Sequence, residues 1–208
     1  MANSDSPFGL MPVRTLQGSP YNSSMANAYF IAAGDATATF VGDLMMLAAT
    51  GTANASAITF ASMNGIDIGT AQSVRQAAAS ADAEIVGVVV GFEPNRDDLS
   101  KQYRVASTER IVYICDNPDM IYHIQESGNI GAASAGLNAD ITVGTGSTVS
   151  GKSAMELDSD TEATTATLPL RILQGAQIAD NDVSASNAVW EVMINAGIHL
   201  YRQTTGVA

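Results

Sequence analysis

The chain alternates between short apolar runs and clusters of Gly, Pro, Asn and Asp, and this spacing limits its possible folds more than any other feature. Roughly eight to ten such runs follow one another at intervals of about a dozen residues. The gaps between them lack helices long enough to connect parallel strands. We therefore predict a mainly β protein, an antiparallel β-sandwich or barrel with at most one short helix and an extended N-terminal arm.

Local signals define some of the elements. The segment 84–92 is the strongest strand, and Gly87 and Gly91 within it indicate a bulge or a close approach of another backbone. The pair Asn64-Gly65 between two apolar runs predicts a hairpin, because both residues tolerate a positive φ. The Ala-rich segment 72–83 is the helix candidate.

Residues 1–27 form the predicted arm, and residues 28–208 form a β-rich domain that can also be divided into two β subdomains near 127–136. Prolines in the arm disfavour both a helix and a central strand. Its apolar side chains indicate that it lies across a surface, either its own or a neighbour's. We expect removal of residues 1–20 to leave the β core folded. The predicted interface anchors of the arm are Phe8, Leu10, Met11 and Val13.

Two single-copy residues lie in strong apolar runs. Trp190, the only tryptophan, lies in a run whose alternation places Trp190, Val192 and Ile194 on one face. It is either a core anchor or a subunit-interface anchor, since tryptophan is enriched at binding hot spots. Cys115, the only cysteine, is predicted to be a buried small hydrophobe.

Charge and hydropathy exclude several classes of protein. The formal net charge is -12, and the nine Lys and Arg residues are scattered along the chain. A protein that coats nucleic acid needs clustered basic residues to neutralise phosphates, so we expect no direct nucleic-acid binding. No apolar run approaches the roughly 20 residues of a membrane-spanning helix, and we expect no membrane partner. No targeting segment is visible, and the absence of disulfides fits synthesis in the host cytoplasm.

The segment 146–153 matches the phosphate-binding loop pattern G-x-x-x-x-G-K-[ST]. That mechanism needs a helix directly after the loop, whose N-terminus faces the phosphates. Here the next residues run into the acidic segment 158–162 instead. We therefore predict a Gly/Ser/Thr turn between two strands, and no nucleotide cofactor.

The acidic and histidine residues give no firm site. Asp158, Asp160 and Glu162 alternate like the start of a calcium loop, but the Gly and Glu that such a loop requires are missing. A solvated acidic loop is expected there, with an adventitious Ca²⁺ or Mg²⁺ as the alternative. His123 and His199 lack metal-ligand spacing and are predicted to be strand or interface residues. We expect no cofactor and no enzymatic activity.

Several segments together resemble a known family. They lie near the start, in the centre and in the second half of the chain: 6–14 (SPFGLMPVR), 86–94 (VGVVVGFEP) with Tyr103-Arg104, Ser107-Thr108 and 116–119 (DNPD), and 136–140 (GLNAD) with 146–148 (GST) and 155–159 (MELDS). They resemble the small virion proteins of tailed bacteriophages that are read as head decoration, or cement, proteins. The resemblance covers most of the chain, although its motifs are turns and strands.

This resemblance implies a virion structural protein on the outer surface of the capsid. Such proteins are β-rich, often homotrimeric, and bind the major capsid protein at local three-fold positions. They stabilise the expanded head by bridging capsomers, and no catalytic residues belong to that role. Two alternatives stay open. A head–tail or tail structural protein of a phage would have the same composition, and a carbohydrate-binding module is the second alternative, for which an aromatic content of 6% is low.

Overall fold

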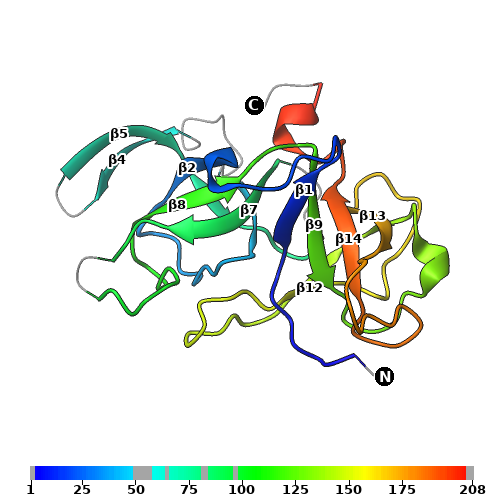
Figure 1. Cartoon of the computed structure of the whole chain (residues 1–208). Helices are drawn as coiled ribbons and strands as arrows, with labels where there is room; N and C mark the ends of the chain where they lie inside the picture. The colour runs from blue at the N-terminus through cyan, green and yellow to red at the C-terminus, as the bar shows by residue number, and fades with distance from the viewer. Residues whose placement is uncertain (1–2, 49–57, 64–65, 81–83, 96–97, 205–208) are drawn as a thin grey trace.

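The computed structural model describes residues 3–48, 58–63, 66–80, 84–95 and 98–204 (Figure 1). Antiparallel strands dominate these residues, and the helical segments among them are single 3₁₀ turns, which confirms the predicted mainly β class. The strands are β1 (Met11–Thr15), β2 (Ala26–Ile31), β3 (Leu44–Leu47), β4 (Ile58–Met63), β5 (Ile66–Gln72), β6 (Val74–Gln76), β7 (Ile85–Phe92), β8 (Arg110–Cys115), β9 (Met120–Gln125), β10 (Asn138–Ala139), β11 (Ile141–Val143), β12 (Met155–Leu157), β13 (Leu170–Gly175) and β14 (Val189–Ile194). The 3₁₀ helices are η1 (Ser23–Met25), η3 (Ala132–Ser134) and η4 (Leu200–Arg202).

Two five-stranded sheets form the body of the molecule. The first sheet has the strand order β1-β9-β14-β13-β10, and the second has the order β2-β8-β7-β3-β6. The chain passes from the second sheet to the first at the turn 116–119, between β8 and β9 (Figure 1). The predicted division near 127–136 does not coincide with this passage between the sheets, because the strands on both sides of it, β9 and β10, belong to the first sheet.

The larger hydrophobic cluster draws on both sheets. Leu44, Val88 and Cys115 of the second sheet share this cluster with Tyr122 and Trp190 of the first. Cys115 is fully buried, and burial raises the pKa of its thiol, as expected for a small hydrophobe. Because one continuous core joins the sheets, they fold as a single sandwich-like unit.

Strand β7 is buried on both faces, which explains its unbroken apolar sequence. Val88 faces the larger cluster, whereas Val86 and Val89 belong to a second, smaller cluster on the other side of the second sheet. The pairing of β7 with β8 shifts register between Val89 and Gly91, so a bulge is present. A Cβ atom on Gly87 would lie 2.1 Å from the Cys115 carbonyl oxygen. Both the predicted bulge and the predicted close approach are confirmed.

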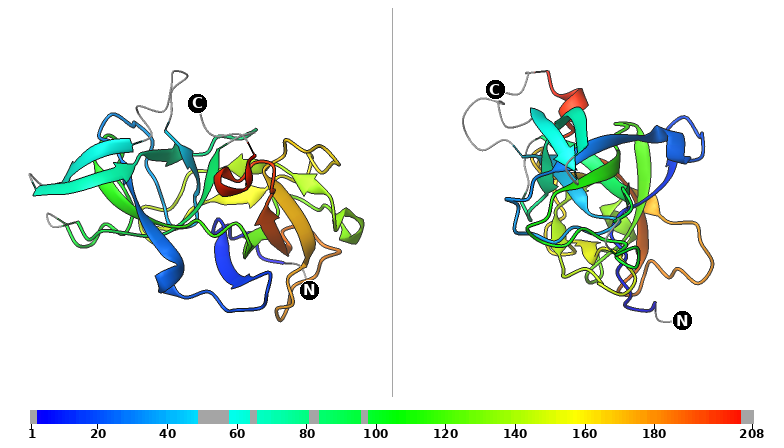
Figure 2. Two further views of the ribbon diagram at one scale, coloured as in Figure 1. Left: turned by 90° about the horizontal axis from the view of Figure 1, so that it is seen from above. Right: turned by 90° about the vertical axis from the view of Figure 1, so that its left-hand side faces the viewer.

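The second sheet curls so that its edge strands approach each other. Phe30 of β2 forms a parallel bridge with Ser73, which lies between β5 and β6. The hairpin β4–β5 extends from this end of the molecule, away from the first sheet (Figures 1 and 2). Met63 pairs with Ile66, which confirms the predicted hairpin, although Asn64-Gly65 itself lies outside the described residues.

The predicted helix at 72–83 is wrong. Gln72 ends β5, and Val74–Gln76 form β6, which pairs with β3. Val74 and Ala77 are buried, so tertiary pairing and burial override the helix propensity of this Ala-rich segment. Residues 81–83 lie outside the described part of the chain.

The N-terminal arm lies on its own chain. Its residues 11–15 form β1, which pairs with β9 at the edge of the first sheet. The Asn3 amide donates to the Asp182 carbonyl at 2.9 Å and accepts from the Asp182 N–H at 3.0 Å. The Gln125 amide accepts from the Ser6 N–H at 2.9 Å. Residues 1–20 thus supply an edge strand of the first sheet, and the folding of the core without them stays a prediction.

Candidate functional site

Three segments of the chain meet beside the arm: residues 8–10, residues 40–43 and the loop 144–154 that joins β11 to β12. The Leu10 N–H donates to the Gly42 carbonyl at 2.9 Å, and the Ser153 N–H donates to the Val41 carbonyl at 2.8 Å. Gly9 and Gly42 both have positive φ, and a Cβ on Gly9 would lie 2.5 Å from the Gly42 oxygen. These backbone contacts fix where the neighbouring side chains project.

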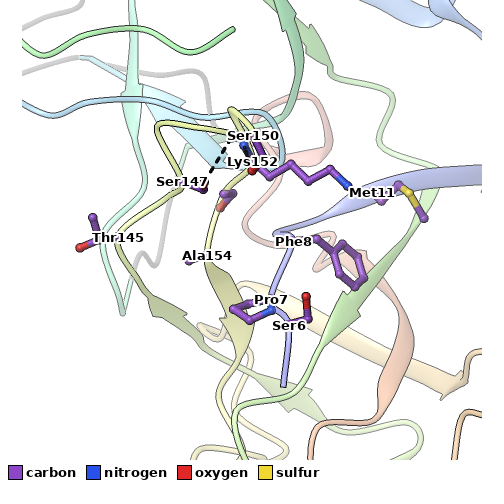
Figure 3. A pocket seen from close by; sticks show the side chains of 10 residues that line it. Ser6, Pro7, Phe8, Met11, Thr145, Ser147, Ser150, Lys152 and Ala154 are labelled. Atoms are coloured by element: carbon purple, nitrogen blue, oxygen red, sulfur yellow. Dashed lines mark hydrogen bonds between the residues drawn. The ribbon is translucent and has the colours of Figure 1, made fainter. Parts of the chain in front are cut away.

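Two adjoining hollows flank this junction, and Phe8, Met11 and Lys152 border both of them. Figure 3 shows the first of the two, the hydroxyl hollow described below. We call the pair the arm groove. The hydroxyl hollow, of about 660 Å³, is lined by the side chains of Ser6, Thr145, Ser147, Ser150 and Ser153. The apolar hollow, of about 380 Å³, is lined by Leu10, Pro12, Tyr21, Val41, Val89 and Val90.

Lys152 is the single charged residue among the lining residues of the arm groove. It is exposed, and none of the salt bridges among the described residues involves it. The Ser147 hydroxyl accepts from the Ser150 N–H at 3.2 Å, so its own hydrogen is free to point into the hollow. The groove therefore offers hydrogen-bond donors and one positive charge beside an apolar surface.

Asp43 stabilises the segment 40–43 beside the arm groove. It is buried, and its carboxylate accepts hydrogen bonds at 2.8 Å from the Phe40 N–H and from the Gln76 amide. Burial raises the pKa of Asp43 to about 6, and these hydrogen bonds act in the opposite direction. The Phe40 ring stacks on Tyr103 with centroids 5.1 Å apart. Asp43 thus holds residues 40–43 against β6.

The structure separates the predicted interface residues into two groups. Phe8 and Met11 gather at the arm groove, where Met11 is 49% exposed, and Val13 lies further along β1, partly buried. Leu10 and Trp190 are each 1% exposed and belong to the larger core cluster. This corrects their predicted interface role, because the chain itself covers them.

Trp190 is a core anchor, held by a buried carboxylate. Its indole N–H donates to the Glu126 carboxylate at 2.9 Å. This pairing could not be predicted from the sequence, because the two residues are far apart in the chain. Lys152 was also missed, since its segment matched a pattern that requires a helix after the loop.

A row of polar side chains crosses the first sheet next to the arm, and its members Glu191 and His123 are buried. The Glu191 carboxylate accepts from Arg14 at 2.7 Å and from the Gln174 amide at 3.0 Å. His123 Nε2 lies 3.6 Å from the other Glu191 oxygen. Because these residues come from four neighbouring strands, we infer that their side-chain contacts stabilise the pairing of the strands in this sheet.

His199 lies elsewhere, in the segment before η4. It is buried, and its Nδ1 accepts from the Tyr201 N–H at 3.2 Å. Burial lowers the pKa of His199 to about 4, so the imidazole is neutral at pH 7. Nearby, the Tyr29 hydroxyl donates to Asp116 at 2.6 Å and contacts the Tyr201 hydroxyl at 2.7 Å. These contacts fasten the C-terminal segment to the second sheet.

The two loop motifs of the sequence, 146–153 and 158–162, follow the strands β11 and β12. Strand β12 follows the loop 144–154, where a phosphate-binding site would require a helix. The Asp158 carboxylate accepts from the Asp160 N–H at 3.0 Å within a local turn. Among the described residues, His, Cys, Asp and Glu form no group of three or more suited to a metal ion.

No helix in the described part of the chain has the length and apolar character needed to cross a membrane. Comparisons with protein-family models, with curated proteins and with solved structures each found no match.

Proposed function

We propose that the chain is a structural protein of a tailed-phage virion. In this role it binds the major capsid protein on the outer surface of the head, as a homotrimer, and stabilises the expanded shell by bridging capsomers. The proposal rests on the family resemblance of the segments 6–14, 86–94 and 136–140. It concerns binding alone and assigns no catalytic residue.

The arm groove is the surface that supports the binding role in this proposal. It combines the resembling N-terminal segment with a hollowed, partly apolar surface next to the exposed Met11. The loop 144–154, which forms its other wall, also exposes Val149 at 93%. Concave apolar surfaces with a few polar groups are the usual form of binding sites. Both walls of the groove are therefore available to a partner.

The proposed mechanism is thermodynamic. A protein that binds the expanded lattice more tightly than the unexpanded one shifts the equilibrium towards expansion, by an amount set by its affinity and concentration. Many copies on one shell multiply this effect, because each adds its own binding free energy. The net charge of -12 keeps the unbound protein soluble at the high concentration that full occupancy requires.

Sedimentation with purified phage shells tests the proposal. We expect the wild-type protein to co-sediment with expanded shells and much less with unexpanded shells. Met11→Asp places a charge at the border of both hollows and should lower occupancy at least about tenfold. Leu16→Asp is the matched control, because Leu16 is also exposed but lies outside the groove. Equal occupancy on both shell types, or none on either, would contradict the proposal.

Copy number in purified virions distinguishes this role from the tail alternative. A head protein on local three-fold positions is present in hundreds of copies or in a fixed ratio to the major capsid protein, whereas a head–tail or tail protein follows six-fold symmetry. Quantitative mass spectrometry measures this ratio directly. A count of about six or twelve would favour the tail role.

A further inference from the structure

We infer that the arm groove binds an extended segment of a partner polypeptide that carries an acidic side chain next to an apolar one. The acidic side chain would contact Lys152, and the apolar side chain would enter the hollow behind Met11. This inference extends the proposed function, because it gives the chemistry of the segment that the protein recognises on the shell.

Charge complementarity indicates the acidic side chain. Lys152 is the only charged residue that lines either hollow, and the salt bridges of the described chain leave it out. A carboxylate placed there would gain a charge-assisted hydrogen bond and further donors from hydroxyls such as that of Ser147. Elsewhere the chain, with its net charge of -12, would repel an acidic partner.

The adjoining apolar hollow indicates the second side chain. Val41, Val89 and Val90 line it, and Met11 and Phe8 separate it from the hydroxyl hollow. In an extended peptide, successive side chains lie about 3.3 Å apart along the chain and residues two apart share a face. One segment can therefore place neighbouring side chains in both hollows, and Lys152, which borders both, sets its direction.

The loop around Lys152 is not built to hold a phosphate group. A phosphate-binding loop points consecutive backbone N–H groups at its ligand. Here the Ser147 N–H donates to the Lys152 carbonyl at 2.9 Å, the Gly151 N–H donates to the Ser147 carbonyl at 2.8 Å, and the Ser153 N–H donates to Val41. Because these donors are used within the chain, a side-chain carboxylate fits the site better than a phosphate.

Short blocked peptides and isothermal titration calorimetry test the inference with the full chain. The probes are acetylated and amidated Ala-Asp-Leu-Ala-Ala and Ala-Asp-Ala-Leu-Ala, each compared with versions that carry Asn or Lys in place of Asp, and inorganic phosphate. We expect an aspartate peptide to bind, at least about fivefold more tightly than its asparagine version at low salt, and less tightly as salt is added.

The variants make the test specific for the groove. Lys152→Met should weaken binding of the aspartate peptide about fivefold or more, and Lys152→Glu should make the lysine peptide the preferred ligand. Lys101→Met is the control and should leave binding unchanged, because Lys101 lies outside the groove and pairs with Asp98 at 3.9 Å. Far-ultraviolet circular dichroism confirms that each variant is folded.

Each outcome decides the inference. Three results would overturn it. The aspartate peptides could bind equally well whatever the residue at 152, neither aspartate peptide could bind at millimolar concentration, or phosphate alone could bind in a way that depends on Lys152. Sedimentation of Lys152→Glu with expanded shells separates this result from the proposed function. If shells bind the variant as well as the wild type, the inference about the shell segment fails and the function stands. If shells bind neither the wild type nor the variant while binding of the aspartate peptide depends on Lys152, the proposed function is refuted and the specificity of the groove is supported.

Discussion

Replacing Glu126 tests how strongly the fold depends on one buried carboxylate. Glu126 directly follows β9 and is fully buried. One of its oxygens accepts from the Trp190 indole at 2.9 Å and from the Ile130 N–H at 3.0 Å, and the other accepts from the Ala188 N–H at 3.1 Å. Burial raises the pKa of this carboxyl, and the three donors act in the opposite direction. The carboxylate therefore joins the segment after β9, at Ile130, to the start of β14, at Ala188 and Trp190.

Glu126→Ala would leave these three N–H donors without an acceptor. Each buried donor without a partner costs about 1–3 kcal/mol, which sets an upper range of about 3–9 kcal/mol. Removing a buried charge recovers part of its desolvation cost, and water can enter the space that the side chain leaves. We expect a net loss of about 3–5 kcal/mol. Glu126→Gln keeps one oxygen but turns an NH₂ group towards a donor, and should cost about 1–3 kcal/mol.

Urea unfolding measures this loss, with two probes. Trp190 is the only tryptophan, so its fluorescence reports the environment of this hydrogen bond directly, and circular dichroism follows the strands. Glu109→Ala is the matched control, because Glu109 is exposed, and it should change stability by less than about 0.5 kcal/mol. If Glu126→Ala were as stable as this control and kept wild-type emission, the reasoning about the buried carboxylate would be refuted.

Substitutions of four other buried residues test their contributions to stability. Asp43 has a raised pKa of about 6, so as the pH falls it takes up a proton in the folded state before it does so in the unfolded state. Its contribution to the free energy of unfolding therefore rises by up to about 3 kcal/mol as the pH falls from 7 to 4. His199 has a lowered pKa of about 4, and its contribution to the free energy of unfolding falls by about as much over the same pH range. Asp43→Asn should therefore make the protein less stable in acid, and His199→Asn should make it more stable in acid. Urea unfolding at pH 7 and 4.5 measures both changes. Gly87→Ala should destabilise the fold by more than about 3 kcal/mol or prevent folding, since its Cβ would meet the Cys115 carbonyl. Gly34→Ala is the control and should fold, because Gly34 has open space around it and no positive φ. Arg104→Lys should lower the midpoint of thermal unfolding by several degrees. The buried guanidinium donates to the carbonyls of Ala32, Asp35, Thr37 and Thr108, and a lysine ammonium cannot reach all four. An unchanged midpoint would contradict this reasoning.

Sequence patterns predicted the strands well, because a strand depends on local features. The unbroken apolar run predicted a strand at 84–92, and the structure has β7 at Ile85–Phe92. The sheet to which each strand belongs was not predictable in this way. The turn 116–119 has the composition of a hairpin turn, yet β8 and β9 belong to different sheets. Sheet membership depends on contacts between residues far apart in the chain, such as the pairing of β1 with β9.

The candidate site was predicted only in part, for a related reason. Phe8 and Met11 were identified because apolar residues in a proline-rich arm need a surface to cover them. The same argument could not tell which of the arm residues this chain covers itself, and it therefore included Leu10. Lys152 gave no signal, because a single lysine acquires a role only through the segments that surround it. Here those segments are residues 8–10 and 40–43, which lie more than a hundred residues away in the sequence.

The pairing of β1 with β9, and the contact of Asn3 with Asp182, determine when the protein can finish folding on the ribosome. The first strand must wait for more than a hundred further residues before its partner exists, which at cellular rates of synthesis takes about 5–20 s. During that interval the nascent arm presents apolar residues with no native partner, and chaperones that bind such segments have time to act. The last step, closure of the amino end over the loop at 182, can only follow synthesis of almost the entire chain.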